Sequence, residues 1–180
     1  MAKLRKASAY RVLERPYTRW SKYKKYSYVR ARPVCRVTKF DMGDPRPKYD
    51  HVINLVSTKS LQIRDHALES ARQTANRTIE KIAGKKGYHL QTRVYPHHVL
   101  RENPLASGAG ADRMSTGMAH SFGKTIGIAA QVREGQTLFT LKVNKQHLQT
   151  ALLALKKAGV KLPPKCRVLE QKIAVKPATV

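Results

Sequence analysis

The sequence predicts an α+β fold, a two-layer sandwich of mostly antiparallel strands with two helices, preceded by an extended basic N-terminal arm. Several segments show the alternation of β-branched and aromatic residues that strands have, whereas only two segments space their apolar residues by three and four. Two helices are too few to cover both faces of a parallel sheet, which favours antiparallel strands. We therefore expect an arm at 1–33, a core domain at 34–175 with a long loop at 103–125, and a tail at 176–180.

The first half of the core is expected to begin with two strands and to continue into a helix. Residues 34–40 and 51–58 have the residue pattern of strands, and the Asp, Gly and Pro residues of 41–45 are typical of a turn. Ser60 is a candidate N-cap, so the helix is predicted over about 61–83.

This predicted helix is nearly balanced in charge. Gly84 is expected to end it, because glycine readily takes the left-handed conformation that follows many helices. Four basic and three acidic residues on its outer side nearly cancel, so we expect this side to meet solvent and not a polyanion. These residues are Arg64, Asp65, Glu69, Arg72, Arg77, Glu80 and Lys81.

The second half is expected to alternate strands with one long loop. A strand at 88–94 is predicted to continue past Pro96 into 98–100. Asn103–Thr125 contains four glycines and no apolar period, and a loop of that length inside a compact domain is usually functional or disordered. The elements expected after it are a hairpin of strands 126–132 and 137–143 around Glu134-Gly135, a helix from Asn144 to Gly159, and a last strand at 166–175.

Positive charge dominates the chain. It has 36 Lys and Arg residues against 11 Asp and Glu residues, for a formal net charge of +25. A compact fold with this imbalance repels itself, so a polyanion is expected to neutralise it, and nucleic acid is the first candidate. A membrane is not expected, because no stretch approaches the roughly 20 apolar residues of a spanning helix, and the N-terminus lacks the apolar core of a signal peptide. We therefore expect a cytoplasmic protein.

Residues 1–33 concentrate both charge and aromatic side chains. They hold 11 Lys and Arg residues, one acid, and six of the chain's 12 aromatic residues, without an apolar period that would contribute to a core. Basic side chains neutralise phosphates, and flat side chains stack on unpaired bases. Folded RNA is preferred to duplex DNA because no helix-turn-helix or zinc-finger pattern appears. The predicted RNA-binding residues are Arg5, Arg11, Arg15, Tyr17, Arg19, Trp20, Lys22, Lys24, Lys25, Tyr26, Arg30, Arg32 and Lys124.

The patterns that resemble catalytic motifs do not meet the requirements of the chemistry. The segment from Gly117 to Thr125 ends in Gly-Lys-Thr, but five residues separate its glycines where a phosphate-binding loop has four. A strand is also predicted after it, where phosphate binding requires a helix N-terminus. Asp112, Ser115 and His120 lie on the Gly-rich loop, which would not hold them within hydrogen-bond reach as a hydrolytic trio.

Metal ligands and cofactors are not expected either. Adjacent strand residues point to opposite faces, so His97 and His98 are predicted to give one inward and one outward imidazole and not a metal pair. Cys35 and Cys166 lie far apart in sequence without neighbouring ligands, so two reduced thiols are expected.

Several segments in order along about residues 35–160 carry a specific resemblance. They are Phe40-Asp-Met-Gly43, residues 67–76, residues 88–101, and Gly110 to Met118 followed by Phe122-Gly-Lys124. Through these segments the sequence resembles the family of large-subunit ribosomal protein sixteen of the universal scheme, in its archaeal and eukaryotic "ten-e" form.

The resemblance implies a structural protein and not an enzyme. It implies an α+β sandwich bound to large-subunit rRNA, with the small rRNA of the large subunit nearby, transfer RNA and neighbouring ribosomal proteins as further partners, and no homo-oligomer. It also implies that the long loop reaches toward the peptidyl-transferase region and helps position transfer RNA. The loop positions that carry over are Gly110, Asp112, Arg113, Gly117 and Met118.

Two other classes of function stay open at this point. A free-standing RNA-binding regulator or chaperone would have the same composition. An RNA-modifying enzyme is disfavoured, because no carboxylate pair, cofactor loop or metal cluster is placed to act.

Overall fold

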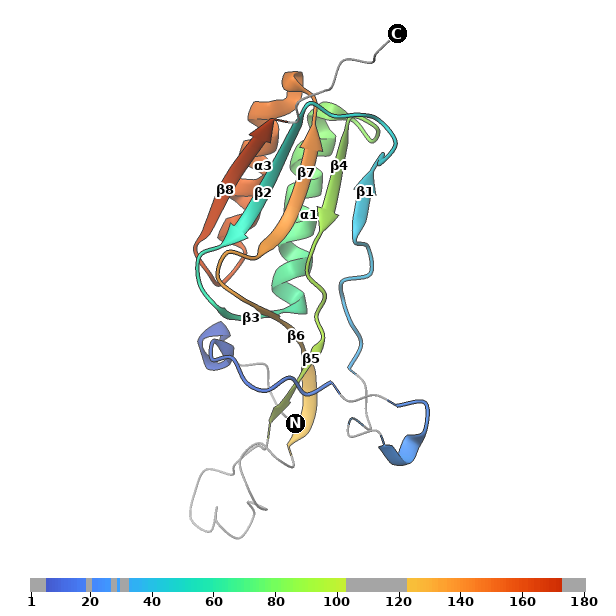
Figure 1. Ribbon diagram of the computed structural model, residues 1–180, viewed down its shortest axis with the longest axis vertical. Coiled ribbons are helices and arrows are strands. Elements are labelled where there is room, and N and C mark those ends of the chain that lie inside the picture. The colour runs from blue at the N-terminus through green and yellow to red at the C-terminus, as the bar shows by residue number, and fades with distance from the viewer. Residues whose placement is uncertain (1–5, 19–20, 27–28, 30–32, 103–122, 173–180) are drawn as a thin grey trace.

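The larger of two sheets has five antiparallel strands, which two helices cover on one face (Figure 1). A computed structural model describes residues 6–18, 21–26, 29, 33–102 and 123–172. The spatial order of the strands is β1-β4-β7-β2-β8. Their bounds are Asp41–Gly43 for β1, His51–Ser57 for β2, Tyr88–Thr92 for β4, Thr137–Val143 for β7 and Cys166–Lys172 for β8.

The main core lies between this sheet and helices α1 (Asp65–Ala83) and α3 (Leu148–Val160). Each helix turns a stripe of apolar residues, many of them alanine, toward the sheet and toward the other helix. Each Leu or Ile buried in this way contributes about 1.5–3 kcal/mol. The fully buried stripe residues are Leu68, Ala71, Ala75 and Ile79 of α1, and Ala151, Ala154, Leu155 and Ala158 of α3.

The smaller sheet has three strands in the order β3-β6-β5, with bounds Leu61–Arg64, Lys124–Val132 and His98–Glu102. Figure 1 shows β5 and β6 running away from the larger sheet, beyond the N-terminal end of α1. Glu102 of β5 pairs with Lys124 of β6, so both ends of the 103–122 segment lie at the tip of this hairpin.

The predicted α+β class, the mostly antiparallel strands and the two helices are confirmed, but the predicted hairpin is wrong. Strands β6 and β7 do not pair, because the turn between them bonds to the β2–β3 connection. Gly135 N donates to Ser57 O at 2.9 Å, and Glu134 N donates to Ser60 Oγ at 2.9 Å. Both connections therefore cross from one sheet to the other side by side.

The start of the first helix was also predicted wrongly. Ser60 does not cap it, because Leu61–Arg64 pairs with β6 as a strand and the helix begins at Asp65. Gly84 does end it, with φ of 67°. Two residues expected on its outer side are buried: Asp65 accepts the Arg36 backbone N–H, and Arg72 pairs with Glu69.

Other boundaries shift for identifiable reasons. Residues 34–40 form no strand, and β1 occupies the predicted turn because Phe40 O and Asp41–Gly43 continue the pairing with β4. The strand predicted from 88 to 100 is two strands in different sheets, separated around Pro96. The remaining corrections are that β6 begins at Lys124 inside the predicted loop, that a 3-10 turn (Lys145–His147) precedes α3, and that α3 passes Gly159 to end at Val160. The last predicted strand is present as β8, and its predicted end at 173–175 lies outside the described residues.

Candidate nucleic-acid interface

The N-terminal arm crosses the smaller sheet in the order of its strands. Val12 O accepts a hydrogen bond from Gln62 Nε2 of β3 at 2.5 Å, and Glu14 O accepts one from Gln131 Nε2 of β6 at 2.8 Å. Tyr17 then meets β5 twice. Three anchors on three strands hold the arm across the sheet, as its path in Figure 1 shows.

The double contact at Tyr17 pairs the arm with β5. Tyr17 N donates to His98 Nδ1 at 2.9 Å, and Tyr17 O accepts from Val99 N at 3.1 Å. At Val12, Glu14 and Tyr17 alike, the anchored arm atoms belong to the main chain, so the arm side chains are left for other contacts. Arg11 and Arg15 are both exposed.

The arm also contributes to a small core of its own, contrary to the expectation from its aperiodic sequence. Val29 is only 3% exposed and packs with Val99 and Ile128. Tyr17 and Cys35 pack against the same cluster. The arm is therefore fastened to the smaller sheet by apolar burial as well as by hydrogen bonds.

Three described aromatic residues of the arm, Tyr17, Tyr23 and Tyr26, differ in what their rings contact. The Arg101 guanidinium lies 3.8 Å from the Tyr17 ring centre, so this half-buried ring already has a cation on its face. Tyr23 and Tyr26, in contrast, are 62% and 48% exposed, with ring centres 6.3 Å apart, and the Lys25 ammonium lies 4.9 Å from the Tyr26 ring. These two rings offer flat surfaces beside a positive charge, which suits an unpaired base.

The structure places most of the described members of the predicted RNA-binding set on the surface. Tyr17 is half-buried, and Lys24 lies in the 3-10 turn Lys24–Tyr26. The exposed members are Arg11, Arg15, Lys22, Lys25, Tyr26 and Lys124. The predicted residues outside the described part of the chain are Arg5, Arg19, Trp20, Arg30 and Arg32 of the arm, and Gly110, Asp112, Arg113, Gly117 and Met118 of the loop.

Gln62, Gln131 and His98 hold the arm, and the sequence alone marks neither glutamine as an arm contact. Both lie in strands, where their neighbours give no sign that the side-chain amide binds a distant main-chain carbonyl. One inward and one outward imidazole were expected for His97 and His98, and the structure has His98 2% exposed and His97 half-exposed.

The anchor at His98 predicts a pH dependence. Burial lowers the pKa of His98, the charge of Glu14 opposes this, and His97 and Arg101 lower it further. The pKa of folded His98 therefore lies below the unfolded value near 6.5. Its contribution to stability is complete above that pH and is lost as pH falls toward the folded pKa, because Nδ1 must stay unprotonated to accept from Tyr17 N.

We expect the melting temperature to fall between pH 7.5 and pH 5, and this fall to be smaller in His98→Gln than in the wild type. His97→Gln is the matched control and should keep the wild-type pH dependence. The protection factor of the Val99 amide, which is its exchange corrected for the intrinsic pH dependence, reports the arm directly and should fall at the lower pH. Equal pH dependence in both variants would contradict the anchor.

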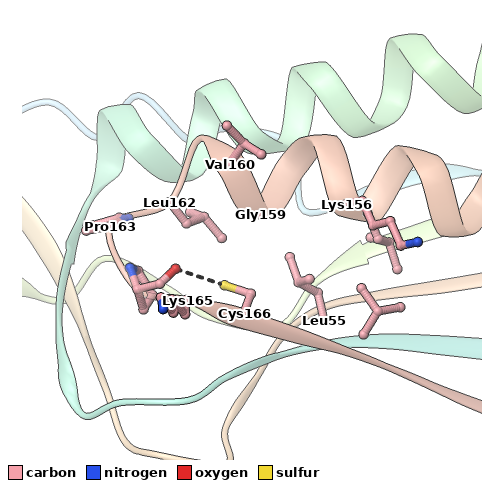
Figure 2. A pocket seen from close by; sticks show the side chains of 11 residues that line it. Leu55, Lys156, Gly159, Val160, Leu162, Pro163, Lys165 and Cys166 are labelled. Atoms are coloured by element: carbon pink, nitrogen blue, oxygen red, sulfur yellow. Dashed lines mark hydrogen bonds between the residues drawn. The ribbon is translucent and has the colours of Figure 1, made fainter.

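An apolar pocket of the core domain lacks the features of a catalytic site. It has a volume of about 470 Å³ and lies between the end of α3 and the start of β8 (Figure 2). Cys166 lines it, and its Sγ donates to Pro164 O at 3.5 Å. Burial raises the pKa of this thiol to about 11, so the sulfur stays protonated and is a poor nucleophile.

Among the described residues, no group of three or more His, Cys, Asp and Glu side chains is placed to hold a metal ion. No helix in this part of the chain is long and apolar enough to cross a membrane.

Comparisons with known proteins find relatives over most of the chain. Residues 16–169 match the family of ribosomal protein L16p/L10e. The chain is 43% identical to the large ribosomal subunit protein uL16 of Methanococcus maripaludis over 94% of its own length and 95% of the relative. The same protein of Archaeoglobus fulgidus is 40% identical, over 92% of each chain, and that of Methanocella arvoryzae is 45% identical, over 83% of this chain and 87% of the relative. The chain therefore belongs to the ribosomal protein L16p/L10e family and is a structural protein of the ribosome, not an enzyme.

Proposed function

We propose that this constituent of the large ribosomal subunit holds large-subunit rRNA chiefly through the arm of residues 1–33, docked on the smaller sheet. The observation that carries this proposal is that the arm's main chain is bonded to the protein while its basic side chains stay exposed. Its main chain is bonded to β3, β6 and β5 through Gln62, Gln131 and His98, while Arg11 and Arg15 stay exposed. The division into this arm, a core at 34–175 and a tail at 176–180 is part of the proposal.

Anchoring raises the affinity that each arginine can provide. A free basic tail loses backbone freedom when it binds, at about 1–2 kcal/mol per residue ordered. The segment from Val12 to Tyr17, which contains Arg15 and directly follows Arg11, has already lost that freedom in the folded protein. A guanidinium that reaches a phosphate from this segment makes two charge-assisted hydrogen bonds without that cost.

The test compares two charge-matched double variants in binding to large-subunit rRNA. We expect the variant Arg11→Gln with Arg15→Gln to bind about 10- to 100-fold more weakly, because each substitution removes one charged hydrogen-bonding group. Arg77→Gln with Lys81→Gln removes the same charge from exposed positions of α1 and should stay within about twofold of the wild type. Equal losses in the two variants would show that net charge, and not the docked arm, holds the RNA.

We infer a second role for the segment at 103–122, which is to help position transfer RNA near the peptidyl-transferase region. Supporting this, Glu102 and Lys124 pair at the tip of a hairpin that runs away from the larger sheet (Figure 1). A segment that begins and ends at such a tip is suited to reach a site remote from the core. The small rRNA of the large subunit and neighbouring ribosomal proteins are the other partners we propose.

Arg113→Ala tests this role separately from rRNA binding. The substitution should leave occupancy in purified large subunits nearly unchanged, because the arm supplies the affinity, but it should slow peptide synthesis by those subunits. Both quantities are measured on the same preparation. Normal synthesis at full occupancy would contradict a role for Arg113 in placing transfer RNA.

A further inference from the structure

A second, smaller pocket lies where the arm meets the core domain. It has a volume of about 220 Å³. On one side is the short 3-10 helix η1 (Ala7–Tyr10), and on the others are β3, the start of α1 and the turn that follows α3. A water molecule occupies about 30 Å³ in the liquid, so this space is larger than a single bridging water needs.

Two polar atoms of the residues that line this pocket are buried without a partner. Gln62 is 3% exposed, and its Nε2 holds Val12 O, but its Oε1 has no hydrogen-bond partner in the described part of the chain. The hydroxyl of Tyr10 is also buried and has no hydrogen-bond partner in the described part of the chain. A buried polar group without a partner typically costs about 1–3 kcal/mol, so native proteins seldom leave two together unless something else binds there.

Two cationic side chains line the same pocket from distant parts of the sequence. The Arg64 guanidinium lies 5.5 Å from the Tyr10 ring centre, and Lys161 extends from the C-terminal end of α3. No acidic side chain of the described residues lines the pocket. The pocket therefore combines positive charge with an unused acceptor on Gln62 and an unused hydroxyl on Tyr10.

Helix η1, which covers one side of the pocket, has few described contacts that hold it in place. None of the residues of η1 is buried, and its described main-chain hydrogen bonds, Ala9 N to Lys6 O and Arg11 N to Ser8 O, stay within the segment. Gln62 Oε1 and Tyr10 Oη are shielded from solvent in the free protein, so a ligand reaches them when η1 shifts. The Val12 anchor lies just beyond η1 and can stay in place during that shift.

We propose that this pocket binds one ribose with its phosphate from an RNA strand. A 2′-hydroxyl donates to Gln62 Oε1, Tyr10 Oη donates to a ribose or phosphate oxygen, and Arg64 and Lys161 hold the phosphate. One nucleotide satisfies the unused acceptor, the unused hydroxyl and the positive charge together. The inference rests on the proposed rRNA binding and adds a defined site that distinguishes RNA from DNA.

Tyr10→Phe gives the sharpest test, because it removes the unpartnered hydroxyl and keeps the ring under Arg64. In the full chain it should leave the melting temperature unchanged or raise it, yet weaken binding to large-subunit rRNA by about three- to tenfold. A hydroxyl with only a structural role would not change stability and affinity in opposite directions. Unchanged affinity would overturn the site.

Lys161→Gln should lower the affinity and reduce the slope of log affinity against log salt by about 0.7, the value for one contact with single-stranded RNA. Lys157→Gln is the matched control: Lys157 is exposed on α3, one turn before Lys161, and does not line the pocket. Wild-type protein should also bind a short oligouridine more tightly than the matching deoxyoligouridine, by about three- to tenfold.

These experiments distinguish a failure of the proposed rRNA binding from a failure of the pocket proposal alone. If the wild-type chain does not bind large-subunit rRNA, the proposed function fails. If it binds, but Tyr10→Phe keeps full affinity or Lys161→Gln behaves like Lys157→Gln, only the pocket is wrong. Binding of oligouridine and deoxyoligouridine with equal affinity would also overturn the ribose contact.

Discussion

The affinity of the chain for large-subunit rRNA should fall by about three to five orders of magnitude between about 50 and 200 mM salt. Basic side chains displace counterions condensed on RNA, and each phosphate contact adds about 0.7–0.9 to the slope of log affinity against log salt. The net charge of +25, with a large share in residues 1–33, supplies enough cations for roughly 6–10 contacts.

Filter binding or calorimetry at four or more salt concentrations measures this slope. The double variant of Arg11 and Arg15 should reduce the slope by about 1.4–1.8, and the double variant of Arg77 and Lys81 should not change it. A wild-type slope that corresponds to only one or two ions would contradict binding through the basic arm.

Gly43→Ala should have the largest effect on folding, a loss of about 2–5 kcal/mol in the free energy of unfolding. Gly43 ends β1 with φ of 86°, and a Cβ there would lie 2.0 Å from Tyr88 O and 2.9 Å from Tyr88 C. These are main-chain atoms of β4, which β1 and β7 hold on both sides, so they cannot move away cheaply. The same oxygen accepts from Asp44 N at 3.0 Å.

Gly135→Ala is the control for this experiment. Gly135 also has a positive φ, 77°, but a Cβ there would meet nothing within 4 Å. It should therefore show only the cost of the left-handed backbone, about 1–2 kcal/mol. Urea unfolding followed by circular dichroism compares the two, and a Gly43→Ala loss no larger than that of Gly135→Ala would contradict the steric argument.

The elements that the sequence predicted well are those whose own residues determine them. Strand β2 and helix α3 carry an apolar pattern that matches their burial, and Gly84 ends α1 as expected. Pairing was harder to predict, because it depends on contacts between distant residues. The Glu134-Gly135 turn has the sequence of a hairpin, yet its amides bond to Ser57 and Ser60, and β6 and β7 join different sheets.

The candidate RNA interface was also only partly predictable from the sequence. Charge and aromatic content predicted an RNA-binding arm, and Arg11, Arg15 and Tyr26 are exposed there. The docking of the arm was not predictable, because it depends on the amides of Gln62 and Gln131 binding main-chain carbonyls 50 and 117 residues away. Residue type alone does not distinguish such a glutamine from a solvated one.

The most direct test of the account is a structure of the large ribosomal subunit that contains this chain. We predict that the Arg11 and Arg15 guanidinium nitrogens lie within about 3 Å of rRNA phosphate oxygens. The bonds from Gln62 to Val12 and from Gln131 to Glu14 should persist in that structure. An arm detached from the smaller sheet, or arginines that face protein or solvent instead of phosphate, would contradict the claim that a docked arm holds the rRNA.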